Sequence, residues 1–339
     1  MLIEYEEKRY HLQDLSGHVR CDLEYAETTT GMFTEQCIVL AEGVYANNIF
    51  HVKVLAHPPP EKASVTRDIF RDIDLFGGER HRKELDKLAV KEKTLENTFF
   101  VILSDVWLDN ESVRTKLKDL FAGYMHAVPD AFIFIGSFSE KTYGADHPRR
   151  VREGLSNLGS MIRQHQSLIN VPCIFVPSAA DPPGGDLLPR KPLPPAITKD
   201  IREKLPNCRF VSNPCRIRWY SQEIVIYRED VTAKMQRHCL VPLDTRETDA
   251  VHKHLVRTLM DQAHLSPLPG RLRPLQIGYE HTMRLYPHPD VLIIADKHES
   301  YDIHYEDALC FNPGSFYQSG FSFVAYWPAA KTVEPSSLS

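Results

Sequence analysis

The sequence predicts two kinds of structure in one chain: a small β-barrel or sandwich at the N-terminus, followed by an α/β domain with a parallel sheet. Two observations lead to this prediction. The first third holds short strand-like runs separated by turn residues, which is typical of small barrels and sandwiches. From Thr98 onward, buried strand-like runs alternate with helical patterns, and this order favours parallel strands joined by crossover helices.

The first third contains four strand-like runs. They are YHLQDL (10–15), HVRCDLE (18–24), EQCIVLAEG (35–43) and NIFHVKVLA (48–56). Turn-forming residues separate them, including Ser16-Gly17, a TTTG tetrapeptide and an ANN tripeptide. Three consecutive prolines after His57 end the β region, because proline cannot donate to a ladder. We therefore place a first domain at residues 1–66.

Residues 67–97 differ in composition from the segments on either side. IDLFGGE (73–79) precedes RHRKELDKLAVKEK (80–93), whose basic residues are interleaved with acidic ones. This composition predicts a solvated connector or surface helix, with a nucleic-acid patch as the alternative. Leu75 and Phe76 precede two glycines and form an apolar tip. The tip either packs the two domains together or contacts a partner.

The α/β domain is expected at residues 98–339. Its first three strands are FFVILSD (99–105), AFIFIGS (131–137) and CIFVPS (173–178). Asn110 is a good N-cap for the first crossover helix, and Pro148 suits the first turn of the second. Further strands are expected at 209–214, 217–229, 291–296 and 321–327, and a Pro-rich loop at 181–196.

Composition and charge exclude several classes of protein. The chain has 339 residues, of which 42% are hydrophobic and 25% charged, as in ordinary globular proteins. No apolar run approaches the roughly 18 residues that span a bilayer. Seven cysteines without a C-x-x-C pair argue against a zinc knuckle or a disulfide framework. The net charge of −5 disfavours a sequence-independent DNA sheath, so DNA contact is expected to be weak or indirect.

Candidate functional residues follow the strands, because reactive groups in open α/β sheets lie at the carboxyl ends of strands. These ends are Ser104-Asp105, Gly136-Ser137, 177–181 and 295–298. The order and spacing of these strand-end motifs resemble those of the calcineurin-like metallophosphoesterases. In that family the motifs D-x-H, G-D, G-N-H-[DE] and G-H-x-H hold two metal ions that activate water and clamp a phosphate.

The family's ligand positions are degenerate in this chain. They carry Asp105, Trp107, Ser137, Ala179, Ala180, Asp181, His264, Asp296 and His298. A two-metal centre needs a bridging carboxylate and several imidazoles, and these residues supply too few. Lys297 adds a cation beside the site. We therefore expect the fold without its chemistry: no catalytic residue, no metal and no cofactor. Asp105 is expected to accept hydrogen bonds from backbone N–H groups rather than ligate an ion.

An ordered set of motifs gives a more specific resemblance. The motifs are LSDVWLD (103–109), FAGY (121–124), SNPCRI (212–217), YPHPDVLIIADK (286–297) and NPGSFYQSGFSF (312–323). Together they resemble the B-subunits of eukaryotic replicative DNA polymerases, and among these the epsilon type. LAEGVY, FHVKVLAHPP and IDLFGGE fit the OB-fold part and connector of the same family, so the resemblance covers essentially the whole chain.

The resemblance implies an OB-fold domain at 1–66, truncated at its start, a connector at 67–97, and an inactive calcineurin-like phosphoesterase domain at 98–339 on which the barrel packs. It implies a nuclear, non-catalytic scaffold for DNA replication and repair. The implied partners are the C-terminal zinc-binding region of the DNA polymerase epsilon catalytic subunit, the other epsilon subunits and the replicative helicase. Members usually begin with a small helical domain, whereas this chain starts with MLIEYEEKRY, within the first OB strand.

Two other functions remain as alternatives. An active metal-dependent phosphodiesterase or nuclease would need ligands at positions 137, 179 and 180. A free single-stranded DNA-binding module would need exposed aromatic residues with basic neighbours on the barrel. The barrel region offers aromatic residues such as Tyr25, Phe33, Tyr45 and Phe50, but the nearby Glu24, Glu27, Glu35 and Glu42 disfavour this alternative.

Overall fold

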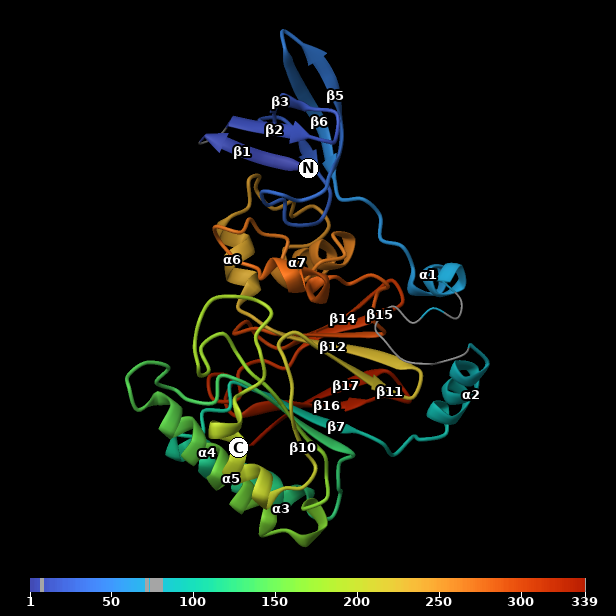
Figure 1. Cartoon of the computed structure of the whole chain (residues 1–339). Coiled ribbons are helices and arrows are strands. Elements are labelled where there is room, and N and C mark those ends of the chain that lie inside the picture. Colours follow the sequence, from blue (N-terminus) through green and yellow to red (C-terminus); the bar gives the residue numbers. More distant parts are fainter. Residues whose placement is uncertain (7–8, 71–72, 74–81, 339) are drawn as a thin grey trace. The chain divides into compact units, whose positions relative to one another are not determined.

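The structure is a computed structural model of the chain, and it describes all residues except 7–8, 71–72, 74–81 and 339 (Figure 1). The chain divides into two compact units. Unit 1 contains residues 1–69, 230–288 and 305–308, and unit 2 contains residues 70–229, 289–304 and 309–339. Among the described residues, no helix is both long and apolar enough to cross a membrane.

Unit 1 is built on a six-stranded sheet. Its strands are β1 (Leu2–Glu6), β2 (Arg9–Gln13), β3 (His18–Asp22), β4 (Glu27–Thr28), β5 (Leu40–Ala46) and β6 (Ile49–Ala56). The order is β1-β2-β3-β6-β4, and β5 pairs with β6. Asn47 and Asn48 both have positive φ at the β5–β6 turn, as the two-residue hairpin requires. The predicted strand 35–43 begins only at Leu40.

Helix α7 of the same unit supplies hydrogen-bond partners to the loop that precedes β5. The helical segments of this unit are α1 (Ala63–Phe70), α6 (Val231–Arg237), α7 (Val251–Asp261) and the 3₁₀ segment η2 (Ile277–Met283). The backbone N–H of Gly31 donates to His254 Nδ1 at 3.0 Å, and that of Met32 donates to Thr258 Oγ1 at 2.7 Å. Because this loop has few ladder partners of its own, side chains of α7 satisfy its buried polar groups.

The compact units do not coincide with the domain ranges that we expected from the sequence. We expected residues 1–66, 67–97 and 98–339 to be separate stretches, whereas residues 230–288 group with the N-terminal sheet. Val241 from this segment joins Leu2, Phe33 and Leu55 in one buried cluster. The physical reason is that the small sheet gains apolar contacts and loop partners from helices distant in the sequence.

His57 in unit 1 gives a prediction about acid stability. Its ring stacks on Phe33 at 4.2 Å, and Gln262 Nε2 donates to its Nδ1 at 2.9 Å. Burial lowers the pKa of His57 from 6.5 to about 4. The unfolded chain therefore binds more protons between these two pKa values, so stability falls as the pH drops through this window. From pH 7 to pH 5, this group should contribute about 2 kcal/mol of lost stability.

The measurement is urea unfolding at both pH values for the wild type and for His57→Gln, which keeps a polar side chain but does not titrate. The wild type should lose about 2 kcal/mol more than the variant over this interval. Equal losses in the two proteins would show that His57 does not drive the acid sensitivity.

Unit 2 contains two sheets. The first has the order β10-β9-β8-β7-β16-β17. Its strands are β7 (Phe100–Ser104), β8 (Ala131–Ile135), β9 (Cys173–Val176), β10 (Cys208–Phe210), β16 (Ser322–Trp327) and β17 (Thr332–Ser337). Strands β7, β8, β9 and β10 are parallel, and β16 is antiparallel to β7. The predicted βαβαβ order is therefore confirmed.

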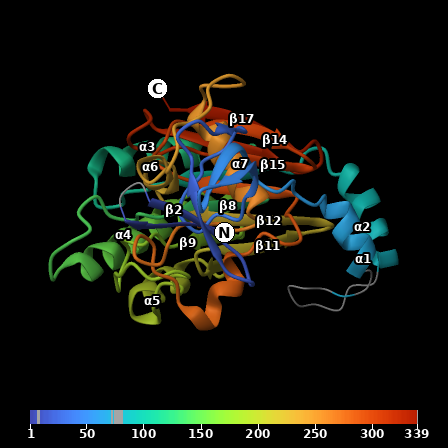
Figure 2. The ribbon, with the colours of Figure 1, turned by 90° about the horizontal axis from the view of Figure 1, so that it is seen from above.

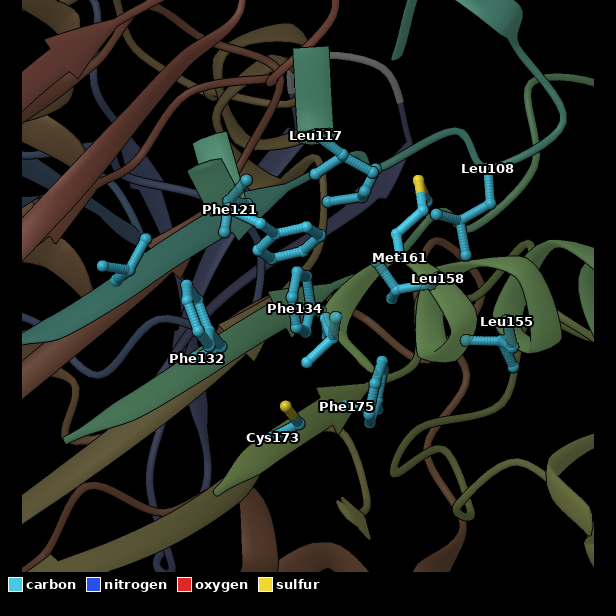
Figure 3. Close-up of a cluster of buried hydrophobic side chains, with 14 of the residues drawn as sticks. Leu108, Leu117, Phe121, Phe132, Phe134, Leu155, Leu158, Met161, Cys173 and Phe175 are labelled. Carbon is cyan, nitrogen blue, oxygen red and sulfur yellow. The ribbon is translucent and has the colours of Figure 1, made fainter. Parts of the chain in front are cut away.

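The crossover helices cover one face of this sheet (Figure 1). They are α3 (Glu111–Tyr124), α4 (His147–Arg163) and α5 (Pro195–Lys204), with a short 3₁₀ turn η1 (Gln166–Leu168). Asn110 caps α3, because its side chain accepts from the N–H groups of Ser112 and Val113. Figure 3 shows Phe121 of α3 near Phe132 and Phe134 of β8. The Phe134 and Phe175 rings stack with centroids 5.2 Å apart.

The second sheet has the order β11-β12-β13-β15-β14. Its strands are β11 (Cys215–Trp219), β12 (Gln222–Arg228), β13 (Val291–Ala295), β14 (Tyr301–Tyr305) and β15 (Ala308–Asn312). β12, β13 and β15 are parallel. Strands β11 and β12 form an antiparallel hairpin and lie side by side in both views (Figures 1 and 2). The single strand that we expected at 217–229 was therefore wrong.

The two sheets of unit 2 face each other across a shared apolar layer. Ile102 and Ile133 of the first sheet pack in one buried cluster with Ile226, Ile293 and Phe311 of the second. The strands β7, β8, β13 and β15 are buried on both faces, as expected for the inner strands of packed sheets. The carboxyl ends of the parallel strands can then contribute side chains to one site.

The connector forms a helix, α2 (Arg82–Lys93), as one of our expectations had it. Its Glu92 is not a solvated residue. The carboxylate is buried and accepts hydrogen bonds from Ser221 Oγ at 2.6 Å and from the Gln222 side chain. Ser221 lies in the turn between β11 and β12, and Gln222 is the first residue of β12. Leu75 and Phe76 lie outside the described residues, so their role stays a prediction.

Candidate functional site

Asp105 follows β7 directly and is fully buried, with 0% of its surface exposed. Its backbone has a φ of 53°, which is uncommon for a residue other than glycine. One carboxylate oxygen, Oδ1, accepts from the N–H of Ser137 at 3.0 Å and from the guanidinium of Arg228 at 2.8 Å. The other oxygen, Oδ2, is buried without a hydrogen-bond partner among the described residues.

Arg228 is the last residue of β12 and only 4% exposed. Its guanidinium donates from Nε to Gly136 O at 2.7 Å, from one Nη to Ala295 O at 3.2 Å, and from the other Nη to Asp105. One planar cation therefore connects the ends of β7, β8 and β13. Hydrogen bonds with a charged donor are stronger than neutral ones, so this side chain holds the strand ends together.

The backbone of Arg228 is itself fixed. Asn213 accepts from the N–H of Arg228 at 2.9 Å and donates to its carbonyl oxygen at 2.7 Å. Arg228 was not among the candidates predicted from the sequence. The sequence did contain a signal, because Arg228 ends an apolar run and is followed by an acidic pair. The expected strand 217–229 continued past Arg228, so Arg228 was not recognised as a strand end.

Asp181 follows β9 and is also fully buried. Its Oδ1 accepts from the N–H of Phe138 at 2.8 Å. Its Oδ2 accepts from both the N–H and the hydroxyl of Ser178, at 2.8 and 2.9 Å. Burial raises the pKa of Asp181, and these three donors partly offset that effect. The carboxylate thus closes the loop after β9 against the loop after β8.

The remaining candidates have other surroundings. Trp107 is half-buried, and its ring lies 5.0 Å from that of Tyr317. The Ser137 hydroxyl is buried without a hydrogen-bond partner among the described residues. Ala179 and Ala180 are half-buried in the loop between Ser178 and Asp181.

The late motif and the isolated histidine complete the set. Asp296 is buried, and its Oδ1 accepts from the N–H of His298 at 3.1 Å. His298 is half-exposed, and Lys297 is exposed. His264 belongs to unit 1, where its Nδ1 accepts from the N–H of Ser266 at 3.1 Å and burial lowers its pKa.

These residues do not fit a two-metal centre. Such a centre needs a carboxylate that bridges the two ions, and position 137 offers a neutral hydroxyl. Three of the four carboxylate oxygens of Asp105 and Asp181 already accept hydrogen bonds. A guanidinium lies against Asp105. Among the described residues, no group of three or more His, Cys, Asp or Glu side chains could hold a metal ion.

Fold and site together define a class of protein: a small β-sheet unit and an α/β unit whose strand-end site holds a buried arginine. Residues 100–303 match the family model for the B-subunits of DNA polymerases alpha and epsilon. Residues 1–59 match the model of the DNA polymerase epsilon subunit 2-like OB-fold domain. The chain belongs to this B-subunit family of DNA polymerases alpha and epsilon, and the predicted combination of an OB-fold domain with an α/β domain is confirmed.

Similar curated proteins carry epsilon names. DNA polymerase epsilon subunit 2 of Mus musculus is 40% identical over 341 residues, which cover 100% of this chain and 64% of that protein. The epsilon B-subunit of Arabidopsis thaliana is also 40% identical, over 100% of this chain and 65% of its own length. This chain therefore spans about two thirds of the length of these relatives. A solved archaeal phosphodiesterase aligns with 71% of this chain and 100% of its own, at 12% identity and a TM-score of 0.39.

Proposed function

We propose that the chain is a non-catalytic accessory subunit of a DNA polymerase epsilon complex. The observation that carries this proposal is the 40% identity along the whole chain to proteins named as the second subunit of that polymerase. The strand-end site supports the non-catalytic part, because a guanidinium and N–H donors occupy the carboxylates that a metal-dependent hydrolase would use.

The proposed partners follow from the family. We propose that the chain binds the catalytic subunit of DNA polymerase epsilon through that subunit's C-terminal zinc-binding region. The other epsilon subunits and the replicative helicase are partners of the resulting assembly, and DNA is contacted weakly or indirectly. The same proposal places the chain in the nucleus, in chromosomal replication and repair.

A co-purification experiment tests the partner proposal. The full chain should co-purify with the C-terminal zinc-binding region of an epsilon catalytic subunit, and much less with the corresponding region of another replicative polymerase. If the apolar tip contributes, Leu75→Ser/Phe76→Ser should weaken binding by about tenfold, the scale of an interface hot spot. Val90→Ser is the matched control, because Val90 is an exposed apolar residue on α2.

Two results would contradict these expectations. Equal co-purification with both polymerase regions would remove the assignment to epsilon. Unchanged binding of the Leu75 and Phe76 variant would leave the subunit assignment intact and show that the tip is not part of the interface.

An assay for metal-dependent hydrolysis tests the non-catalytic proposal. Calorimetric titration with Mn²⁺ should give no stoichiometric binding of two ions, because the bridging carboxylate is absent and Arg228 lies against Asp105. A chromogenic phosphodiester should not be turned over above the rate of a buffer control. Turnover that disappears in Asp105→Ala would establish the alternative of an active phosphodiesterase.

A free single-stranded DNA-binding module is less well supported. Of the four aromatic candidates, Phe33 is 1% exposed and stacks on His57, and Phe50 packs against the barrel core. Tyr25 and Tyr45 are exposed, but Glu24, Glu27 and Glu42 are exposed as well, where a phosphate backbone would need basic residues. Nanomolar binding of single-stranded DNA at physiological salt would favour this alternative.

A further inference from the structure

The strand ends of unit 2 concentrate negative potential in a buried place. Asp105 is 0% exposed, and the carbonyl oxygens of Gly136 and Ala295 accept from the same guanidinium that Asp105 does. A buried carboxylate is unfavourable unless a partner compensates its charge. The cluster offers one carboxylate and two carbonyl oxygens, a donor set typical of sites for hard cations.

We propose that Arg228 is a tethered structural cation. Its guanidinium supplies, from within the chain, the positive charge that this oxygen cluster requires, and it occupies the cluster in place of a diffusible ion. On this view, the arginine takes the place of a bound ion, and the missing ligands are no longer needed. This proposal goes beyond the accessory-subunit function and does not depend on it.

The contacts distinguish this role from ordinary packing. Each of the three guanidinium nitrogens donates to an oxygen at the end of a different strand: Nε to Gly136 after β8, one Nη to Ala295 of β13, and the other Nη to Asp105 after β7. Asn213 fixes the Arg228 backbone through both its N–H and its carbonyl oxygen. Arginine suits such a role, because its guanidinium is always charged and presents its donors in a rigid plane.

A tethered cation should be replaceable by a free one of the same shape. Arg228→Ala removes the guanidinium and leaves the three oxygens, so methylguanidinium should bind there and stabilise the variant. N-methylurea is the matched neutral probe, with nearly the same shape and no charge. The readout is the midpoint of thermal unfolding of the full chain with about 20 mM of either compound, converted to a change in the unfolding equilibrium constant.

We expect methylguanidinium to lower the unfolding constant of Arg228→Ala by about tenfold, as a ligand at ten times its Kd would do. The wild type should not respond, and N-methylurea should have no effect on either protein. In Asp105→Asn/Arg228→Ala, where the carboxylate charge is gone, the response to methylguanidinium should fall to the wild-type level. Equal responses to the charged and neutral probes would overturn the proposal, and so would an undiminished response in the double variant.

If Arg228→Ala is recovered only in an unfolded state, the readout becomes the refolding yield of the purified variant. Methylguanidinium should then raise the yield of protein with wild-type near-ultraviolet circular dichroism, and N-methylurea should not. Recovery with neither compound would count against the proposal, because the vacated oxygens would then not accept a free cation. Equal recovery with both compounds would overturn the proposal, because it would show that Arg228 supplies volume rather than charge.

Discussion

Replacing Arg228 with methionine should lower the free energy of unfolding by about 3–5 kcal/mol, the usual loss when one partner of a buried ion pair is removed. Methionine fills much of the volume but donates no hydrogen bond. Asp105, at 0% exposure, would lose the guanidinium that lies 2.8 Å away. The carbonyl groups of Gly136 and Ala295 would also lose a donor. Urea unfolding of the full chain measures the loss.

A double-mutant cycle separates the charge effect from packing. Asp105→Asn/Arg228→Met should be more stable than Arg228→Met alone, because the unpaired buried charge is gone. Arg152→Met is the matched control in the same unit: Arg152 pairs with Asp200 at 2.8 Å, but both side chains are partly exposed. Its loss should stay below about 1 kcal/mol. A loss from Arg228→Met as small as this would mean that the buried pair contributes little to stability.

The secondary structure of the α/β unit was largely predictable, because its signals are local. The apolar runs that became β7, β8 and β9 are short and separated by helices with clear N-terminal signals at Asn110 and Pro148. The β11–β12 hairpin was not predictable in the same way. Its turn places Tyr220 at a φ of 51°, a conformation that usually favours glycine or asparagine, so no turn residue marked the break.

The division of the chain into two compact units depends on long-range contacts that sequence patterns do not reveal. The loop 30–38 binds residues of α7 and the segment after it, more than 200 positions away. An amphipathic pattern shows that α7 buries one face, but it does not show which sheet that face meets. Contiguous domain ranges therefore could not separate residues 230–288 from the α/β unit.

The candidate site was predictable in its location and less so in its contents. Parallel strands predicted that Asp105, Ser137 and Asp181 follow the ends of neighbouring strands, and the Ser137 N–H indeed donates to Asp105. The metallophosphoesterase motifs led us to expect missing ligands, but they did not predict which side chain lies against Asp105. That group is an arginine, which is not a metal ligand, on a strand of the second sheet. Arg228 was missed for this reason.

Gly136→Ala should be the other strongly destabilising change, at roughly 3 kcal/mol, because it forces atoms together in a buried site that cannot relax freely. A Cβ on Gly136 would lie 2.0 Å from Asp181 Oδ2 and 2.8 Å from the backbone nitrogen of Ser178. Asp181 cannot move aside without cost, since Phe138 and Ser178 donate three hydrogen bonds to its buried carboxylate. Leaving such donors and acceptors unpaired is itself unfavourable by about 1–3 kcal/mol per group.

The matched control for this change is Gly123→Ala on α3, where an added Cβ meets no atom within 4 Å. That substitution should stabilise the protein by up to about 1 kcal/mol, because alanine is the better helix former at an exposed helical position. Urea unfolding of both variants and the wild type measures whether each substitution lowers or raises the free energy of unfolding. If Gly136→Ala were as stable as the wild type, the loops after β8 and β9 would have to be free to separate. The Asp181 hydrogen bonds could not then be the contacts that hold this end of the sheet closed.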